Sequence, residues 1–206
     1  MKIAIIGLGN MGKGLAKRLA GKAELVVAAR DAASANSFAA SLKNVSSASV
    51  SEAILASDIV VLATPDGAAL ELAALPELKG KILVDISNPV KPDFSGLALG
   101  HITSAAEEIQ AVAKTAQVVK AFNTIFAGLF DQEVAATRRV PVFLAGEESA
   151  VEAVAALVAA AGFAVEKTGG LDAARLLEPV GMLNIRFGYG LGRGTAIAPN
   201  WLALAA

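Results

Sequence analysis

Short apolar runs alternate along this chain with longer segments whose apolar residues recur at helical spacing. Apolar runs bounded by polar residues are typical of strands buried on both faces of a sheet. They predict strands at Lys2–Ile6, Leu25–Ala29, Val45–Ala48, Asp58–Ala63, Lys81–Asp85, Gln117–Ala121, Val140–Ala145 and Ala164–Lys167. The longer segments predict helices at Gly12–Ala20, Ala32–Leu42, Ser51–Ala56, Gly67–Leu75, Thr103–Lys114, Ser149–Ala161 and Leu171–Asn184. This alternation predicts an α/β fold with a doubly wound, mostly parallel sheet.

The first predicted strand runs directly into Gly7-Leu-Gly9-Asn10-Met11-Gly12. A G-x-G-x-x-G sequence between a strand and a helix is typical of the Rossmann dinucleotide-binding turn, where a helix N-terminus faces a pyrophosphate. In that turn Gly7 permits the bend, Gly9 lets the phosphates approach the backbone, and Gly12 lets the helix pack on the strand. We assign all five residues Gly7, Gly9, Asn10, Met11 and Gly12 to cofactor binding. The alternative is a structural turn without a ligand.

The end of the second predicted strand, Ala29-Arg30-Asp31, indicates which dinucleotide is bound. NAD sites usually carry an acidic residue here for the ribose 2′-OH, whereas an arginine accommodates the 2′-phosphate of NADP. Arg30 can pair with that phosphate and stack on adenine, and Ser34 can donate a further hydrogen bond. We therefore expect NADP. In the alternative, Asp31 binds the ribose and Arg30 is a solvent-exposed charge.

Small and hydrogen-bonding residues follow three further predicted strands. Because ligands of open α/β sheets bind beyond the carboxyl ends of the strands, we expect these residues to converge on one crevice. Asn88 is a candidate for the nicotinamide carboxamide or its ribose, with the cofactor set completed by Ala63, Thr64, Pro65 and Pro89. The residues that we assign to the pocket of a second ligand are Ser87, Phe122, Asn123 and Thr124. The alternative for each is an ordinary turn residue.

The only histidine, His101, lies just before Thr103 and Ser104 at the start of a predicted helix. It is a candidate general acid or hydrogen-bonding residue of the second-ligand pocket, or a loop residue that orients the helix. Thr103, Ser104 and the helix N-terminus either bind an anionic part of that ligand or cap the helix, since Ser104-x-x-Glu107 fits a capping box. Asp85 is expected to hold a loop by hydrogen bonds rather than to act as a base.

Composition narrows the functional classes. The chain is 55% hydrophobic and 18% charged, which excludes a disordered protein and predicts extensive burial, including at a subunit interface. A net charge of -1 without a basic tract argues against nucleic-acid binding. Cysteine is absent and histidine occurs once, so disulfides, thiol nucleophiles and cysteine or histidine metal sites are excluded. No targeting or membrane-spanning segment is visible in the sequence, so we expect a cytoplasmic protein without membrane contact.

Taken together, these motifs resemble those of NADPH-dependent reductases of the deazaflavin coenzyme F420. The cytosolic domain of the six-transmembrane ferric reductases is also similar. The resemblance covers almost the whole chain, is most specific at Val118–Thr124, and rests on Gly7–Gly12, Ala29–Arg30, Ala63–Pro65, Ser87–Pro89, Val118–Thr124 and Leu177–Pro179. It implies NADP on the glycine turn, with Arg30 at the 2′-phosphate. It also implies a flavin-like ring over the nicotinamide, between the Asn88 loop, the Phe122–Thr124 loop and the C-terminal segment.

The segment after Gly170 departs from the alternating pattern. Its helix carries apolar residues on more than one face, and glycines at Gly188, Gly190, Gly192 and Gly194 then predict a flexible loop. We expect an NADP-binding Rossmann domain over residues 1–170. Residues 171–206 are then a helical appendage that completes the second-ligand pocket and forms a homodimer interface, as the resemblance also implies.

The leading functional prediction is an NADP-dependent oxidoreductase that exchanges hydride with a flavin or deazaflavin. Direct transfer between two ring systems needs no acid–base pair, because the cofactors carry the chemistry and the protein positions them. One alternative is a dehydrogenase or imine reductase for a small substrate, which usually needs a larger second domain than the roughly 35 residues after Gly170. The other is a non-catalytic, NADP-binding redox sensor.

Overall fold

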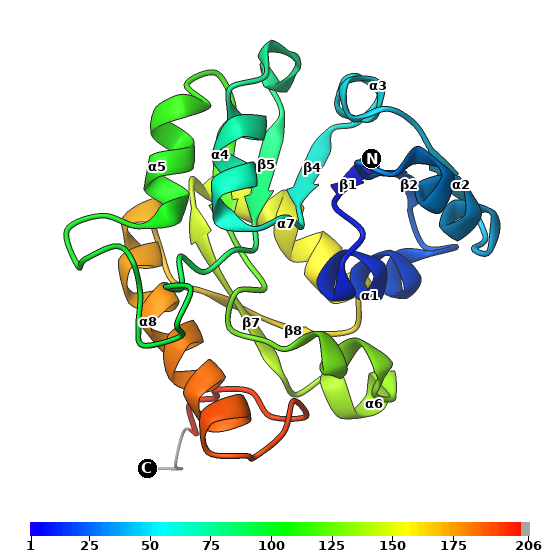
Figure 1. The fold of residues 1–206 in the computed structure, drawn as a ribbon. Helices are drawn as coiled ribbons and strands as arrows, with labels where there is room; N and C mark the ends of the chain where they lie inside the picture. The colour runs from blue at the N-terminus through cyan, green and yellow to red at the C-terminus, as the bar shows by residue number, and fades with distance from the viewer. Residues whose placement is uncertain (203–206) are drawn as a thin grey trace.

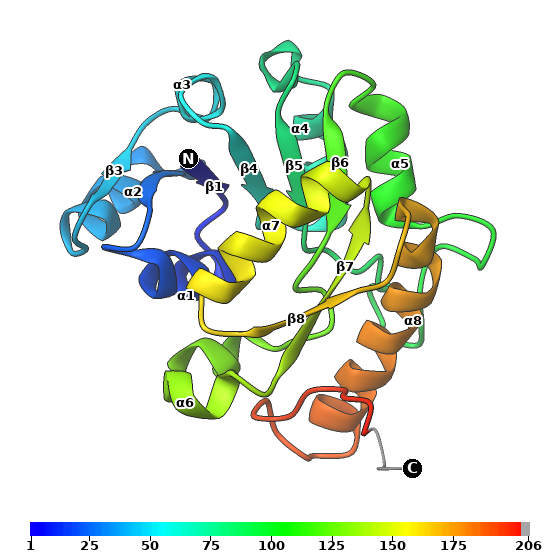
Figure 2. The same ribbon diagram turned by 180° about the vertical axis from the view of Figure 1, so that it is seen from behind.

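The computed structural model describes residues 1–202, apart from the side chain of Asp66. An eight-stranded sheet forms its middle layer, in the order β3-β2-β1-β4-β5-β6-β7-β8 (Figure 1; β3 and β6 are labelled in Figure 2). All neighbouring strands are parallel except β6 and β7, which are antiparallel. The strands are β1 (Lys2–Ile6), β2 (Glu24–Ala28), β3 (Val45–Ser47), β4 (Ile59–Leu62), β5 (Ile82–Asp85), β6 (Gln117–Lys120), β7 (Pro141–Gly146) and β8 (Ala164–Lys167). The predicted doubly wound, mostly parallel fold is confirmed.

Helices cover both faces of the sheet, which explains why its strands are apolar on both sides. Along β1, Ile3 and Ile5 pack in one cluster with α1 (Asn10–Leu19) and α7 (Glu148–Ala160), which lies in front of the sheet in Figure 2. Ala4 and Ile6 pack in the opposite cluster with α3 (Val50–Leu55), α4 (Asp66–Ala73) and α5 (Ala105–Val112). The remaining helical elements are α2 (Ala32–Ala40), α6 (Val134–Thr137), α8 (Ala174–Ile185) and the short turns η1 (Pro76–Leu78), η2 (Ala127–Asp131), η3 (Leu171–Ala173) and η4 (Arg186–Gly190).

Two serines cap helices, and for Ser104 the spacing to Glu107 predicted this role. Ser49 caps α3 in a complete capping box with Glu52. Ser104 caps α5, but the Glu107 carboxylate accepts from the Ser104 hydroxyl at 2.8 Å rather than from its backbone N–H. The same carboxylate is held by Arg175 of α8 in a two-pronged ion pair, so the predicted capping box is only half formed.

The C-terminal segment is more ordered than its glycines predicted. After α8, a π-helical turn continues through Gly190, so the predicted flexible loop does not begin at Gly188. Gly188 is buried, and a Cβ atom on it would lie 2.5 Å from the Phe126 ring. This glycine therefore serves close packing rather than flexibility. Helix α8 lies against the rest of the fold through its contacts with α5 and through Leu177, which packs on Phe143 of β7.

Candidate functional site

The glycine turn lies where the strand order reverses, between β1 and β4. Gly7 has a left-handed φ of 102°, and a Cβ atom on it would lie 2.4 Å from the Ala63 carbonyl oxygen at the end of β4. On Gly12, a Cβ atom would lie 1.9 Å from the Gly7 carbonyl oxygen. Both glycines are thus required by the packing of the turn itself.

Gly9 differs from its two neighbours, because the space beside it is empty. It adopts an ordinary extended backbone conformation with φ −72° and ψ −169°, and no atom lies within 4 Å of where its Cβ would be. It precedes α1, whose first turn has neither a capping side chain nor an acidic residue. The free N–H groups of that turn and the positive helix end fit a pyrophosphate, and a side chain on Gly9 would fill the space it needs.

The end of β2 separates the roles of Arg30 and Asp31. Asp31 is the N-cap of α2, where its Oδ1 accepts hydrogen bonds from the backbone N–H groups of Ala33 at 3.0 Å and Ser34 at 3.2 Å. Arg30 is exposed and makes no ion pair with any side chain that the structure describes. The hydroxyl-bearing Ser34 lies exposed in the first turn of α2. Asp31 is thus engaged as a helix cap, whereas Arg30 has no such structural role among the described residues.

Four buried polar atoms at the carboxyl ends of β4, β5 and β6 lack a hydrogen-bond partner among the described residues. They are Thr64 Oγ1, Ser87 Oγ, Asn123 Oδ1 and Thr124 Oγ1. The two other atoms of this kind belong to Ser57 and Glu77, which precede β4 and β5. Buried polar groups normally find partners, so a cluster of unsatisfied ones marks a place where a ligand or water completes the bonding. All four residues were predicted from the sequence as site residues.

Asn88 and Asn123 join the loops after β5 and β6. The Asn88 side-chain amide donates to the Asn123 carbonyl at 2.7 Å, and the Asn123 amide donates to Asn88 Oδ1 at 3.0 Å and to the Leu177 carbonyl at 2.9 Å. Gly181 of α8 lies directly against this pair, because a Cβ atom on it would be 2.7 Å from Asn88 Oδ1. The two loops and α8 therefore contact one another directly.

Phe122 does not line the predicted pocket. Its ring is 1% exposed and lies 6.4 Å from both Phe130 and Phe163, centroid to centroid, within the core under α1 and α7. Its backbone is left-handed, with φ 58°. The sequence could place Phe122 at a strand end but could not show to which side its ring turns.

The segment before α5 also differs from its prediction. His101 is exposed, and no hydrogen bond joins it to another residue within 1–202. Ser104 is fully buried as the helix cap. The N-terminus of α5 holds an anion of the protein itself, since Glu178 accepts from the N–H groups of Ala105 at 3.1 Å and Ala106 at 3.4 Å. The place considered for an anionic ligand beside Thr103 and Ser104 is therefore taken.

Sequence analysis missed a buried ionic cluster beside this site. Lys120, fully buried at the end of β6, donates to Asp85 Oδ2, Glu178 Oε1 and the Ser87 carbonyl, each at 2.7 Å. Burial alone would lower the pKa of Lys120, but the two carboxylates outweigh it and raise that pKa, so Lys120 is an ammonium ion. The available signal was a lysine inside an apolar strand run and a glutamate on an apolar helix. Asp85 also accepts from the Ser87 N–H at 2.9 Å, which confirms its predicted loop-holding role.

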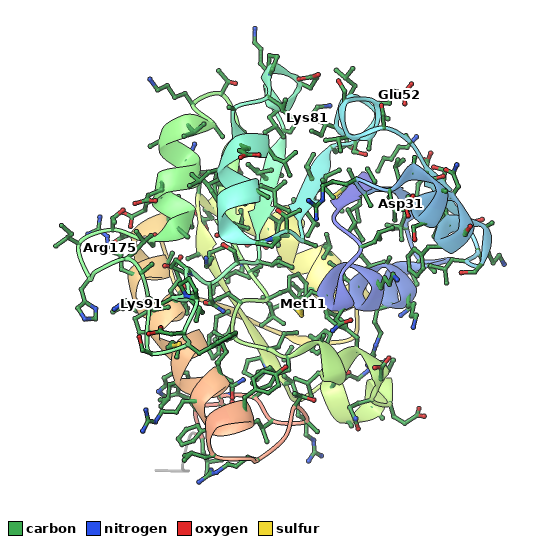
Figure 3. The ribbon with its side chains drawn as sticks, viewed as in Figure 1. Met11, Asp31, Glu52, Lys81, Lys91 and Arg175 are labelled. Carbon is green, nitrogen blue, oxygen red and sulfur yellow. The ribbon has the colours of Figure 1, made fainter. Side chains whose placement is uncertain are left out.

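A groove of about 820 Å³ runs along α8 and η4, facing the loop after β5. Figure 3 labels Lys91 in that loop and Met11 in the first turn of α1. The groove is mainly apolar, with one guanidinium and two aromatic rings; its lining is Phe94, Ser95, Met182, Ile185, Arg186, Tyr189, Gly190 and Leu191. Met182, which lines the groove, follows Gly181 in α8, and Gly181 packs on the Asn88–Asn123 pair. The described residues contain no group of three acidic or histidine side chains that could hold a metal ion.

The fold and the glycine turn define a Rossmann-type dinucleotide-binding protein, and comparison with known proteins narrows this class. The family model described as NADP oxidoreductase, coenzyme F420-dependent, matches residues 2–89. A solved structure of a putative F420-dependent NADP-reductase from Arthrobacter sp. FB24 is 30% identical, with a TM-score of 0.82, and the match covers 95% of this chain and 96% of that one. The chain belongs to this family of NADP-dependent oxidoreductases.

Two further similar proteins differ more from this chain, one because it is much longer and the other because its sequence is less similar. Metalloreductase STEAP3 of Rattus norvegicus is 30% identical over 181 residues, which are 87% of this chain but only 36% of that protein. The chain therefore spans about a third of the length of this relative. An imine reductase from Aspergillus terreus shares the fold at 19% identity and a TM-score of 0.69, over 93% of this chain and 63% of that one. Among residues 1–202, no helix has the length and apolar character needed to cross a bilayer.

Proposed function

We propose that this protein transfers hydride directly between NADP(H) and a flavin or deazaflavin. The proposal rests on the groups that meet at one edge of the sheet, beyond the carboxyl ends of its parallel strands. There the open turn at Gly9 follows β1, and the unsatisfied polar atoms follow the next strands in the sheet, β4, β5 and β6; they belong to Thr64, Ser87, Asn123 and Thr124. A dinucleotide whose pyrophosphate lies at Gly9 has its nicotinamide end directed toward these groups.

The residues of the chain bind and orient, while NADP when bound supplies the hydride. The first turn of α1 binds the pyrophosphate, and Arg30 binds the 2′-phosphate with Ser34 as a second donor. Asn88 holds the nicotinamide end with the amide hydrogen and lone pair that Asn123 leaves free. Helix α8, which packs against the loops after β5 and β6, helps to hold the reacting atoms at the roughly 3–3.5 Å that hydride transfer requires.

The acceptor ring occupies the groove between α8 and the loop after β5. A volume of about 820 Å³ lies in the range of pockets that hold small molecules and cofactors. The rings of Phe94 and Tyr189 offer apolar faces for a planar heterocycle, and the Arg186 guanidinium can pair with an anionic substituent. The small-substrate alternative has the fold of the imine reductase in its favour, but His101, the one candidate acid, is exposed and hydrogen-bonds no described residue.

A turnover experiment tests this function. The purified protein is mixed with NADPH and with FMN, FAD or a deazaflavin, and absorbance of the reduced nicotinamide is followed. Oxidation of NADPH that depends on both the protein and the acceptor supports the proposal. Tight NADPH binding without oxidation by any acceptor would favour the redox-sensing alternative.

The Arg30→Ala variant is expected to bind NADPH about 10- to 150-fold more weakly, with NADH affinity unchanged. The loss corresponds to about 1.5–3 kcal/mol, the range for a hydrogen bond to a charged group. Calorimetric titration with both nucleotides measures it. Lys43→Ala, which removes another exposed positive charge, should leave both affinities unchanged. Equal losses for NADPH and NADH in the Arg30 variant would contradict the assignment.

We also propose a homodimer that uses the outer face of α8. Leu176 is 71% exposed and Leu183 is 50% exposed, and their spacing of seven residues places them on one side of the helix. Exposed apolar faces are rare on monomers, and a two-fold dimer is the commonest way to cover them. Light scattering should give twice the chain mass for the natural protein and the chain mass for Leu176→Glu/Leu183→Glu. A natural protein that is monomeric at micromolar concentration would refute the dimer.

A further inference from the structure

The buried cluster around Lys120 joins four segments that are distant in sequence. The three hydrogen bonds of the Lys120 ammonium go to Asp85 at the end of β5, to the Ser87 carbonyl in the following turn, and to Glu178 in α8. Glu178 in turn accepts from the first N–H groups of α5. All three donors of the ammonium are therefore used, and every partner belongs to a different element from β6.

Each charged group of the cluster has partners within the protein, although burial raises the pKa of Glu178 in spite of Lys120 beside it. Two carboxylates face one ammonium, and the excess negative charge lies against the positive end of α5 and the Ser87 N–H. A buried network of this kind costs free energy when any member is removed, because the remaining charges are left unpaired. The cluster thus fixes one relative arrangement of its elements.

The cluster is continuous with both walls of the acceptor side of the site. Ser87 gives both its N–H and its carbonyl to the cluster, so the peptide groups on either side of it are held, and Asn88 is the next residue. In α8, Gly181 lies three residues after Glu178 and touches Asn88, and the following residue, Met182, lines the groove. A shift of Glu178 would therefore move the helix wall of the groove against its loop wall.

We propose that Lys120, Asp85 and Glu178 are positioning residues that assemble the acceptor side of the site, leaving the dinucleotide turn to form independently. The inference rests on the proposed function for the identity of the acceptor. It assigns no chemical step to Lys120, which is enclosed by its own partners. The turn at Gly9 lies on β1 and α1, and neither contributes a residue to the cluster.

The test uses Glu178→Gln in the full chain, since glutamine keeps the size of the side chain and one acceptor for Lys120. Hydrogen–deuterium exchange is expected to rise in residues 86–97 and 177–191 and to stay at the natural level in residues 2–19. NADPH affinity should change little, because the pyrophosphate and adenosine ends of the cofactor bind away from the cluster, while KM for the acceptor rises about tenfold, equivalent to about 1.4 kcal/mol. Lys120→Met should raise hydrogen–deuterium exchange in the same two regions by a larger amount. If that variant does not fold, the result for Glu178→Gln decides alone.

Two controls separate positioning from general loss of stability. Arg175→Ala breaks the partly exposed ion pair that also links α8 to α5, and it should leave both readouts unchanged. Val154→Ala opens space in the buried face of α7 and lowers the melting temperature without changing exchange in 86–97 or KM for the acceptor. Unchanged exchange in Glu178→Gln, or a rise spread equally over 2–19, would overturn the inference. If neither a flavin nor a deazaflavin supports NADPH oxidation by the natural protein, the proposed function fails. The exchange pattern then still decides the role of the cluster.

Discussion

Gly9→Val is expected to abolish NADP binding while leaving the fold intact. The backbone at Gly9 is extended and its Cβ position is open, so the protein can accept the valine side chain. The pyrophosphate cannot, because the side chain occupies its place in front of α1. Loss of two charge-assisted hydrogen bonds corresponds to about 3–6 kcal/mol, or roughly 10²- to 10⁴-fold in Kd. Calorimetry with NADPH and a thermal melt of the same sample measure both parts of the prediction.

Gly7→Val provides the contrast for this variant. At Gly7 a side chain would meet both a left-handed backbone and the Ala63 carbonyl oxygen 2.4 Å away, so this variant should lose stability as well as binding. If Gly9→Val bound NADPH with natural affinity, the turn could not be the phosphate site.

Asn88→Leu is expected to slow turnover about 100-fold or more while changing NADPH affinity little. The substitution removes both hydrogen bonds to Asn123 and leaves the Asn123 carbonyl buried without its donor. It frees the loop after β5 from the loop after β6, and a misplacement of reacting groups by about 1 Å can cost about 100-fold in rate. The adenosine end binds at Arg30 and the first turn of α1, so most of the NADPH affinity remains.

The measurement is kcat/KM for the acceptor beside the Kd of NADPH. Gln132→Leu, the same exchange of an amide for leucine at an exposed position, should change neither. An Asn88→Leu variant with full activity toward flavin and deazaflavin acceptors would remove this residue from the site.

The strands were predictable because parallel strands buried on both faces leave continuous apolar runs, such as Ile59–Leu62 in β4. The antiparallel direction of β7 was not predictable, since an apolar run carries no mark of its direction. The glycine turn followed from the spacing of its glycines between a predicted strand and a predicted helix. The acceptor side did not, because it depends on contacts between distant segments. Lys120 and Glu178 are 58 residues apart, and only the folded chain shows that they meet.

The Phe122 ring and the N-terminus of α5 also depend on distant contacts that the local sequence could not predict. The prediction placed the Phe122 ring in a crevice, whereas its positive φ and its neighbours Phe130 and Phe163 place it in the core. A free helix N-terminus near His101 looked suited to an anionic ligand, but Glu178 reaches it from α8. Local sequence can indicate a helix end or a strand end, but not which distant side chain arrives there.

Transfer of a deuterium label tests the central claim most directly. NADPH carrying deuterium at the reactive C4 position of the nicotinamide is incubated with the protein and an oxidised deazaflavin, whose reduced ring carbon does not exchange its hydrogen with water. Direct hydride transfer predicts that mass spectrometry finds the deuterium on the reduced deazaflavin, and that it remains there in ordinary water. Oxidation of NADPH with the deuterium lost to solvent, or no oxidation with any flavin or deazaflavin acceptor, would contradict the account.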